Sequence, residues 1–375
     1  MTRIGVIGGG QLARMMQPAA IALGVELRVL AESENSSAHQ AVSMVGDYNE
    51  FSVLENFSKT VDVITFDHEH VPVSHLAKLE ETGVLVRPGA GALIHAQNKL
   101  VMRQAMEKLS LPQPIWQEVR SERDLQNFLN DHAQAVVKTP IGGYDGKGVR
   151  VVTKTSEVAD WLENLEQFGG SLLAEQKIDF QRELSQLSAR NANGEFSAWP
   201  LVQTNQHKGV CSEVIAPAPG TSDLALASKI AQTVAEGLNV TGVMAVELFE
   251  DSAGRLLINE LAMRPHNSGH FSIEGSVTSQ FEQHLRAVAN LPLGATDMKS
   301  DMAVMVNLLG VDDKNTFVEH YPAVMKKFPR VKFHSYEKSA RAGRKMGHLT
   351  TLGSNAKEIL DMTLAARDAL YRGGV

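Results

Sequence analysis

Short apolar runs alternate with helix-length segments at the start of the chain. The runs are rich in Val, Ile and Leu, which favour strands, and residues 11–23 have the apolar spacing of a helix. The expected strands are residues 3–8, 25–30, 41–45, 61–66 and 84–86. Parallel strands need crossover connections of this length, so the alternation predicts a doubly wound parallel sheet covered by helices.

The pattern changes after residue 96. A helical period over 98–109 ends at Leu111-Pro112-Gln113-Pro114, and a smaller strand-and-helix pattern with a glycine-rich loop extends to residue 178. Further helices are expected over 224–237 and 356–371. The expected later strands are residues 183–189, 195–202 and 243–261. We therefore expect three parts, 1–96, 97–178 and 179–375, the last with a small strand-rich end region over 295–375.

Composition narrows the functional classes. The 375 residues are 43% hydrophobic and 21% charged, which is typical of a soluble globular protein of two or three domains. A formal net charge of -7 disfavours a nucleic-acid partner, which needs surplus Lys and Arg. The single cysteine, Cys211, excludes an internal disulfide and suits a reducing cytoplasm. We expect no secretory signal and no membrane span, because no segment approaches ~20 apolar residues.

Two strands near residue 250 carry candidate metal ligands. They are joined by the turn Asp251-Ser252-Ala253-Gly254. If that turn closes a tight hairpin, Glu247 lies opposite Ile258 and Glu260 shares the same face. Two converging carboxylates repel, and a shared magnesium ion that accompanies phosphates is the usual compensation. The alternative is a solvated polar face, although both strands are otherwise apolar and run into the polar stretch 264–270.

Two glycine-rich segments could bind anions. Residues 8–13 (GGGQLA) follow an expected strand and match a turn that directs backbone N–H groups at an anion. With Glu32 after the second strand, they fit a dinucleotide site equally well, or a purely structural turn. Residues 139–149 hold four glycines within seven positions, which would let the backbone approach a phosphate chain, and Lys138 and Lys147 supply positive charge beside it. The alternative there is a surface hairpin.

Three weaker patterns remain open. Residues 172–178 (LLAEQKI) suit a strand beside an adenine, with Glu175 bonding the base amine, or an exposed edge strand. The basic run 325–348 suits a phosphate monoester, a solvated surface or an RNA patch. Its candidate phosphate-binding residues are Tyr336, Lys338, Arg341, Gly343, Arg344 and Lys345. The sequence 67–70 (DHEH) with His75 resembles a metal site only superficially, because neighbours on a strand point to opposite faces.

Taken in order, these motifs resemble the N5-carboxyaminoimidazole ribonucleotide synthetase family, ATP-grasp enzymes of purine biosynthesis. The segments that carry the resemblance are GGGQLARM, NKL, VVK, GGYDGKG, LLAEQKI, VMAVELF, INELAMRPHNSGH and GRKMGH. The resemblance implies a chain of α/β and α+β class with an N-terminal doubly wound pre-ATP-grasp domain, a central lid and a C-terminal antiparallel domain. ATP would be clasped between the lid and the C-terminal domain. A cytoplasmic homodimer is also implied.

The resemblance further implies an ATP site. Lys99 and Lys138 would contact the phosphates. The loop that closes over them would comprise Gly143, Tyr144, Asp145, Gly146, Lys147, Gly148 and Val149. The adenosine would meet Glu175, Gln176, Lys177, Ile178, Glu183 and His207. Glu247 and Glu260 would hold Mg²⁺, and Asn259 would act through its backbone or indirectly, because strand parity turns its side chain away from Glu260.

The implied reaction joins ATP, bicarbonate and 5-aminoimidazole ribonucleotide into N5-carboxyaminoimidazole ribonucleotide, with ADP and phosphate released through carboxyphosphate. Arg264 would hold bicarbonate or carboxyphosphate, and Asp145 would orient or deprotonate the substrate amine. The bicarbonate pocket would be framed by His266, Asn267 and Ser268. The ribonucleotide would contact Gln11, Leu12, Glu69, Tyr144 and Lys147, and its phosphate would contact Lys338, Arg344 and Lys345.

The chain departs from the family pattern at a few positions, and other functions stay open. Met263 stands where proline is common and Pro265 follows Arg264, while Thr204 replaces a frequent acid. Asp67, His68 and His70 stand where Glu, an aromatic and Asn are more usual. The competing hypotheses are another ATP-grasp carboxylate–amine ligase, a nicotinamide-dependent dehydrogenase using Gly8, Gly10 and Glu32, and a non-catalytic nucleotide sensor.

Overall fold

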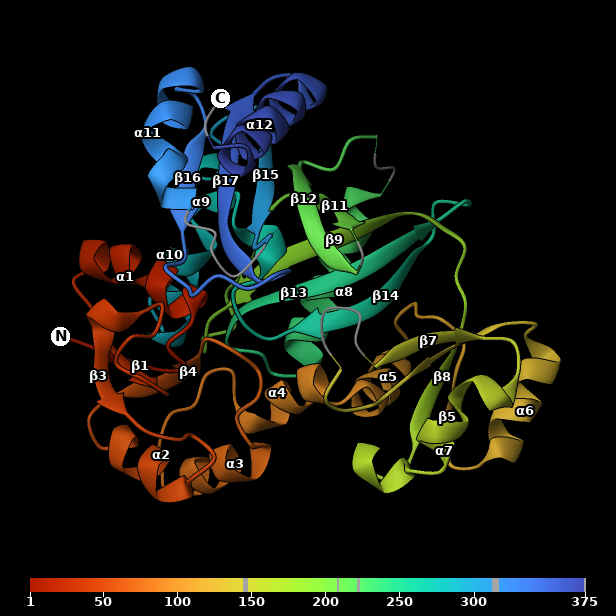
Figure 1. Ribbon diagram of the computed structural model, residues 1–375. Helices are drawn as coiled ribbons and strands as arrows, with labels where there is room; N and C mark the ends of the chain where they lie inside the picture. The colour runs from red at the N-terminus through yellow and green to blue at the C-terminus, as the bar shows by residue number, and fades with distance from the viewer. Residues whose placement is uncertain (144–147, 208, 221–222, 312–316, 374–375) are drawn as a thin grey trace.

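The computed structural model describes residues 1–143, 148–207, 209–220, 223–311 and 317–373. Strands in these residues form three sheets, two of four strands and one of nine. In Figure 1 the N-terminal sheet lies at the lower left, the second four-stranded sheet at the lower right, and the large sheet runs above and between them. In the described residues no helix combines the length and apolar character that a bilayer crossing requires.

The N-terminal sheet is parallel, with strand order β3-β2-β1-β4. Its strands are β1 (Arg3–Ile7), β2 (Glu26–Ala31), β3 (Val42–Val45) and β4 (Val63–Phe66). The associated helices are α1 (Gln11–Leu23), η1 (His39–Ala41), α2 (Phe51–Ser58), α3 (Val73–Glu81) and α4 (Ala90–Gln97). The predicted parallel sheet is confirmed. Residues 84–86 were expected to form a strand and make only an isolated bridge, between Val86 and Ile64.

The second sheet is antiparallel, with order β5-β8-β6-β7. Its strands are β5 (Trp116–Val119), β6 (Ala135–Lys138), β7 (Val149–Val152) and β8 (Leu172–Gln176). The helices in this part of the chain are α5 (Lys99–Lys108), α6 (Glu122–Asp131), η2 (Thr155–Val158), α7 (Ala159–Leu162) and η3 (Leu165–Phe168). Asn98 caps α5 by accepting the N–H groups of Leu100 and Val101, and this cap fixes where the helix that carries Lys99 begins.

The large sheet is antiparallel, with order β14-β13-β9-β11-β12-β15-β17-β16, and β10 pairs with β9 beside it. Its strands are β9 (Phe180–Arg190), β10 (Phe196–Ala198), β11 (Val202–His207), β12 (Val210–Ala216), β13 (Gly242–Asp251), β14 (Leu256–Ala262), β15 (Met302–Leu309), β16 (Lys332–Ser335) and β17 (Lys345–Gly353). Its helices are α8 (Leu224–Gly237), η4 (Asn267–Gly269), α9 (Ser272–Gly275), α10 (Gln280–Val288), α11 (Phe317–Lys327) and α12 (Ala356–Tyr371). The predicted helices α1, α8 and α12 are confirmed. The single strand expected over 195–202 is wrong, because buried Trp199 interrupts it between β10 and β11.

The β13–β14 hairpin differs from the predicted register. Val246 pairs with Leu261 and Leu248 pairs with Ile258, so a β-bulge places Glu247 opposite two residues, Asn259 and Glu260. The expected pairing of Glu247 with Ile258 is therefore wrong. A uniform two-residue period cannot predict the extra residue that a bulge inserts.

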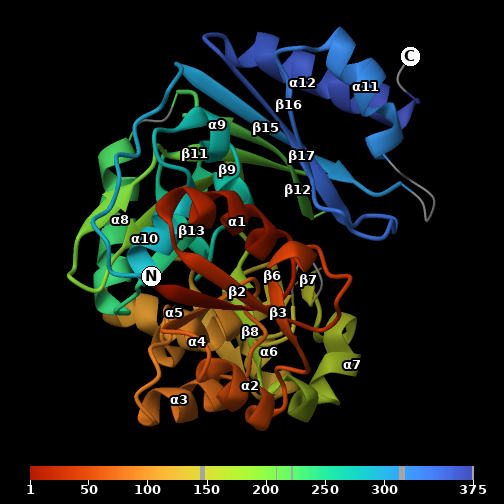
Figure 2. The same cartoon turned by 90° about the vertical axis from the view of Figure 1, so that its left-hand side faces the viewer.

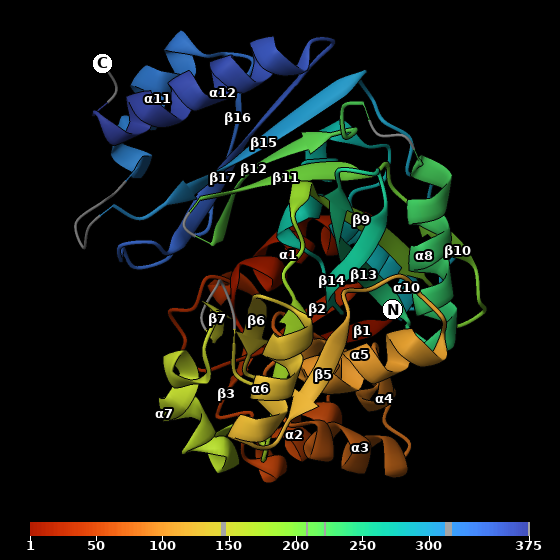
Figure 3. The ribbon, with the colours of Figure 1, turned by 90° about the vertical axis from the view of Figure 1, so that its right-hand side faces the viewer.

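The cores join two of the sheets and leave the third separate. One apolar cluster contains Phe57 and Phe66 of the N-terminal part together with Met244 and Ile258 of the large sheet. A second one brings residues of α1 against α10 and Tyr336, and Figure 2 shows α1 beside α10. The cluster under the β5–β8 sheet contains only residues between 119 and 174. This sheet, at the lower left of Figure 3, therefore has a core of its own, as a movable lid requires.

Replacing the cap of α12 tests the energetics of a helix distant from the cavity. The Asn355 side chain accepts the Glu358 N–H at 3.1 Å. We expect Asn355→Ala to lower the free energy of unfolding by about 1 kcal/mol, because that N–H loses its partner. Urea denaturation followed by circular dichroism measures the change, and Asn355→Asp, which keeps an accepting oxygen, serves as control. Equal stability of all three proteins would contradict the assignment of this cap.

Candidate active site

One cavity of about 1190 Å³ lies where the three sheets meet. Its wall runs from Gln11 in α1, through Lys138 and Glu175 of the lid, to Glu247 of the large sheet and Lys345 of β17. The volume exceeds that of a typical small-molecule pocket, so it can hold more than one substrate. Candidate residues more than three hundred positions apart in sequence therefore share one wall.

The lid end of the cavity contains a buried ion cluster. Glu175, 2% exposed, accepts Arg103 Nε at 2.6 Å on one carboxylate oxygen and lies 2.8 Å from Lys138 Nζ through the other. Burial raises the pKa of Glu175, but the charges of Lys138 and Arg103 outweigh it, so the pKa lies below its usual value. The Glu175 side chain thus fixes Lys138 on one oxygen and bonds Arg103 through the other, and its expected bond with the base amine stays a prediction.

The bulge directs polar side chains of the hairpin into the same cavity. Asn259 Oδ1 accepts Lys138 Nζ at 3.2 Å, so its side chain faces the site and the expectation that it turns away is wrong. Glu260 lies 3.6 Å from Lys99 Nζ. Glu247 lies 3.1 Å from His266 Nε2. All three lining residues, Glu247, Asn259 and Glu260, are thus directed to one wall because two of them lie opposite the third.

Two carboxylates in the cavity wall, those of Glu247 and Glu183, differ in the direction in which their pKa is shifted. Burial raises the pKa of Glu247, but its contact with His266 outweighs burial, so the pKa is lowered. Glu183 also lines the cavity and has no such partner among the residues that the structure describes, and burial, aided by the charge of Glu247, raises its pKa to about 7. Glu183 is thus protonated in part at neutral pH, whereas Glu247 is an anion.

The bicarbonate-pocket candidates form a braced loop. His266 Nδ1 lies 2.8 Å from Ser268 Oγ, which lies 2.7 Å from Ser185 Oγ of β9. Gln280 accepts the His266 N–H and donates to the His266 carbonyl, both at 2.8 Å. Gln280 Nε2 also lies 2.8 Å from Nδ1 of His270, a buried residue that lines the cavity and that the sequence analysis missed. The loop is therefore held from both flanks before any ligand arrives.

Arg264 is oriented from the N-terminal part. Glu69 accepts the Met263 N–H at 2.5 Å, and its other oxygen lies 3.2 Å from Arg264 Nε. The Glu69 carboxylate expected to bind the ribonucleotide is thereby engaged by the 263–264 backbone turn and the guanidinium. Met263 donates this N–H where a proline would have none, so the departure at 263 adds a bond between the two parts.

The opposite end of the cavity is basic. Lys338 donates to Gln11 Oε1, and Lys338, Arg341, Arg344 and Lys345 all line the wall. Burial lowers the pKa of Lys338 to about 8, assisted by the charges of the neighbouring Arg344 and Lys345 and opposed by that of Asp67. A phosphate monoester placed here would relieve the repulsion among these cations.

A side chain of the protein itself occupies the anion position at the glycine turn before α1. Asp67 Oδ1 accepts the Ala13 N–H at 2.7 Å, and a Cβ at Gly10 would collide with the Asp67 carboxylate. Gly8 has φ +101°, which L side chains rarely adopt. A half-buried carboxylate thus occupies the place where a dinucleotide would put its pyrophosphate, which disfavours the dehydrogenase hypothesis.

The side of the cavity where the adenine is expected has apolar side chains in its wall. Phe180 and Phe249 stack with centroids 4.5 Å apart, and both line the cavity. From the lid, Val149 and Val151 face the same space. Gln176, Lys177 and Ile178 line the cavity as well.

The structure does not bring every candidate into the cavity. Tyr144, Asp145, Gly146 and Lys147 lie outside the described residues. Exposed His207, Gly148 and buried Ser268 do not line the wall, although Ser268 braces His266. The sequence analysis missed Arg103, whose only signal is its position four residues after Lys99, on the same helix face.

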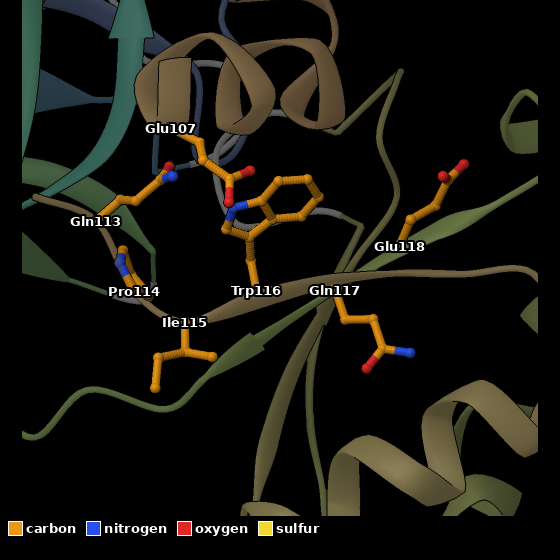
Figure 4. A pocket seen from close by; sticks show the side chains of 7 residues that line it. All are labelled: Glu107, Gln113, Pro114, Ile115, Trp116, Gln117 and Glu118. Carbon is orange, nitrogen blue, oxygen red and sulfur yellow. The ribbon is translucent and has the colours of Figure 1, made fainter. Parts of the chain in front are cut away.

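A second hollow, of about 560 Å³, lies around Trp116 (Figure 4). It is lined by Glu107, Gln113, Pro114, Ile115, Trp116, Gln117 and Glu118. Its charged lining residues, Glu107 and Glu118, are both acidic. It therefore does not suit a phosphorylated ligand, and the cavity between the sheets is the candidate active site.

Three family models match the chain in succession. A ribonucleotide synthetase preATP-grasp domain matches residues 1–97, an ATP-grasp domain matches 104–281, and a phosphoribosylaminoimidazole carboxylase C-terminal domain matches 303–362. The N5-carboxyaminoimidazole ribonucleotide synthase of Mycobacterium tuberculosis (strain ATCC 25618 / H37Rv) is 43% identical over 377 residues, which cover 99% of this chain and 88% of the relative. The Bacillus subtilis (strain 168) synthase is 35% identical, with 92% and 90% covered.

Solved structures of related proteins superpose on nearly the whole chain. N5-carboxyaminoimidazole ribonucleotide synthetase from Thermus thermophilus superposes with a TM-score of 0.86 at 36% identity, and 98% of each chain is covered. The Aspergillus clavatus synthase in complex with ADP and 5-aminoimidazole ribonucleotide gives 0.88 at 28% identity, with 99% of each chain covered. The fold, the cavity and these relatives agree, and the chain belongs to the N5-carboxyaminoimidazole ribonucleotide synthetase family of ATP-grasp ligases.

Proposed function

We propose that the protein uses ATP and bicarbonate to carboxylate the amino group of 5-aminoimidazole ribonucleotide, giving N5-carboxyaminoimidazole ribonucleotide, ADP and phosphate. One observation carries the proposal: a single cavity joins the Lys99–Lys138 region, the Arg264–His266 loop and the Lys338–Lys345 basic wall. These three environments suit a triphosphate, a small carboxylate and a phosphate monoester respectively. Relatives of the same fold hold ATP, or ADP with this ribonucleotide.

The ATP half of the site uses the lid and the hairpin. Lys99 and Lys138 bind the phosphates, while Phe180 and Phe249 with the lid valines enclose the base. Among the described residues no group of three or more His, Cys, Asp or Glu is arranged to hold a metal ion. Glu247 and Glu260 nonetheless suit Mg²⁺, which is commonly bound by one or two carboxylates together with substrate phosphates. When bound, Mg²⁺ offsets the charge that develops on the phosphoryl oxygens.

The phosphoryl and carboxyl transfer steps use the remaining candidate residues. Bicarbonate held by Arg264 attacks the terminal phosphoryl group, and ADP leaves as carboxyphosphate forms. Carboxyphosphate then yields carbon dioxide and phosphate beside the substrate amine, whose attack forms the carbamate. Asp145 is proposed to take the amine proton, and His266, Asn267 and Ser268 to keep the carboxylate group oriented. Lid closure keeps water from carboxyphosphate.

Further features of the assembled enzyme belong to the same proposal. Residues 1–96 bind the ribonucleotide, 97–178 form the lid and its preceding helix, and 179–375 supply the ATP-grasp sheet and the end region. We place the enzyme in the cytoplasm as a homodimer, in keeping with what the family resemblance implies. Nucleic acid has no part in the reaction.

An assay of ADP formation tests the function against its alternatives. We expect ADP release in the presence of Mg²⁺ to require bicarbonate and to rise sharply with 5-aminoimidazole ribonucleotide, with labelled bicarbonate entering an acid-labile product. A rate of ADP release that does not change when the ribonucleotide is added would contradict the proposal. ATP binding without turnover would indicate a sensor, and fluorescence enhancement of added NADH would favour the dehydrogenase.

Removing one charge from the hairpin tests the metal assignment. We expect Glu260→Gln to lower Mg²⁺-dependent turnover by at least roughly tenfold, because a charged ligand is lost while the side-chain shape is kept. Steady-state rates against Mg²⁺ concentration measure the effect, with thermal unfolding as the check on folding. The control is Glu236→Gln on the exposed end of α8. A wild-type rate in Glu260→Gln would refute the assignment.

The lowered pKa of Lys338 predicts a pH dependence for ribonucleotide binding. Below a pKa of about 8 the ammonium is charged and attracts the substrate phosphate, and above it the charge is lost. We therefore expect KM for the ribonucleotide to rise about tenfold between about pH 7 and about pH 9. Lys338→Arg stays charged over this range and should flatten the profile. Identical profiles for both proteins would show that Lys338 does not bind the phosphate.

A further inference from the structure

Arg103 joins the lid, the hairpin and the preceding helix at one buried point. It lies in α5 and is fully buried. Besides Glu175, its guanidinium donates to the carbonyl oxygens of Ile258 at 2.7 Å and Asn259 at 2.9 Å. These carbonyls belong to the bulged part of β14, directly before Glu260. Five N–H donors in a planar fork make such a three-way contact possible for arginine alone.

The contacts close a ring that includes Lys138. Arg103 bonds Glu175, Glu175 pairs with Lys138, and Lys138 donates to Asn259, whose carbonyl returns to Arg103. Four elements, α5, β8, β6 and β14, each contribute one member. The ring carries two cations and one anion, so its surplus charge is positive beside the cavity.

The stability of the core alone does not explain why position 103 holds an arginine. Desolvating a guanidinium is unfavourable, and an apolar side chain of similar volume commonly stabilises a core at least as well as a buried ion cluster. Arg103 does not line the cavity, so it does not touch a ligand. Its contacts instead determine the positions of groups that do line it, namely Lys138, Asn259 and Glu260.

The geometry points to Arg103 as a positioning residue for phosphoryl transfer. It holds the bulge so that Asn259 and Glu260 face the ATP phosphates, and it holds Glu175 so that Lys138 is fixed against Asn259. This inference rests on the proposed ATP site but does not depend on which acceptor is carboxylated. Arg103 therefore acts on MgATP and leaves the distant ribonucleotide wall unchanged.

Binding of MgADP, measured by calorimetry, tests the inference without any turnover. We expect Arg103→Met to weaken MgADP binding by roughly tenfold or more, because the buried ring loses a charge and three donated bonds. KM for MgATP should rise and kcat should fall, while KM for the ribonucleotide stays within about twofold. Arg103→Lys keeps the charge and one contact with Glu175, so it should recover part of the affinity.

The matched control is Arg190→Met. Arg190 also donates to a backbone carbonyl, that of Val240, but lies at the end of β9 away from the cavity. We expect Arg190→Met to leave MgADP binding unchanged even if it lowers the melting temperature. Wild-type MgADP affinity in folded Arg103→Met would overturn the inference, as would equal losses for MgATP and ribonucleotide.

Two further outcomes are informative. If Arg103→Met does not fold, Arg103→Lys is measured instead; MgADP binding weakened about threefold or more supports the inference, and wild-type binding overturns it. If the wild-type protein binds MgADP but does not carboxylate the ribonucleotide, the proposed function fails while the comparison of Arg103 variants still stands. The two failures are thus distinguishable.

Discussion

Charge compensation across the three sheets is the constraint on which the active site depends. Each acidic side chain that faces the cavity from the lid or hairpin is paired with a cation or a histidine from another element: Glu175 with Arg103 and Lys138, Glu260 with Lys99, and Glu247 with His266. Unpaired burial of any of these charges would be unfavourable, so docking of the sheets and formation of the site are one event. Glu183 has no such cation among the residues that the structure describes, and its pKa is accordingly raised to about 7.

This balance explains why nucleotide and metal ion would bind together. A triphosphate attracts Lys99 and Lys138 more strongly than a single carboxylate does, because it carries more charge. If Lys99 turned toward phosphate, Glu260 would lose its compensating cation. Glu260, with Glu247, would then suit a divalent ion, whose charge would restore the balance. The lid takes part in the same exchange, since Lys99 also lies 3.4 Å from the Gly143 carbonyl and its own N–H bonds Pro140.

The sequence predicted the repeating parts of the fold well and the irregular parts poorly. The helices α1, α8 and α12 follow from apolar spacing with clear ends, and the parallel sheet follows from alternation. The bulge between Glu247 and Glu260 could not be predicted from alternation, because alternation assumes that each residue of one strand lies opposite one residue of the next. Motifs brought Glu247, Glu260 and Arg264 into the candidate site. Arg103 was not predicted, because its role depends on three hydrogen bonds to residues that are distant in sequence.

The glycine turn shows how one motif can serve a different ligand. A helix N-terminus attracts anions, and in dinucleotide sites the anion is a pyrophosphate. Here the anion is Asp67, which accepts the Ala13 N–H; burial raises its pKa, opposed by that bond and by the charge of Lys338. Asp67 in turn attracts Lys338, which also donates to Gln11 of the same helix. Asp67 thereby links the N-terminus of α1 to Lys338, the lysine proposed to bind the substrate phosphate, so a turn suited to holding two phosphates helps instead to place this lysine.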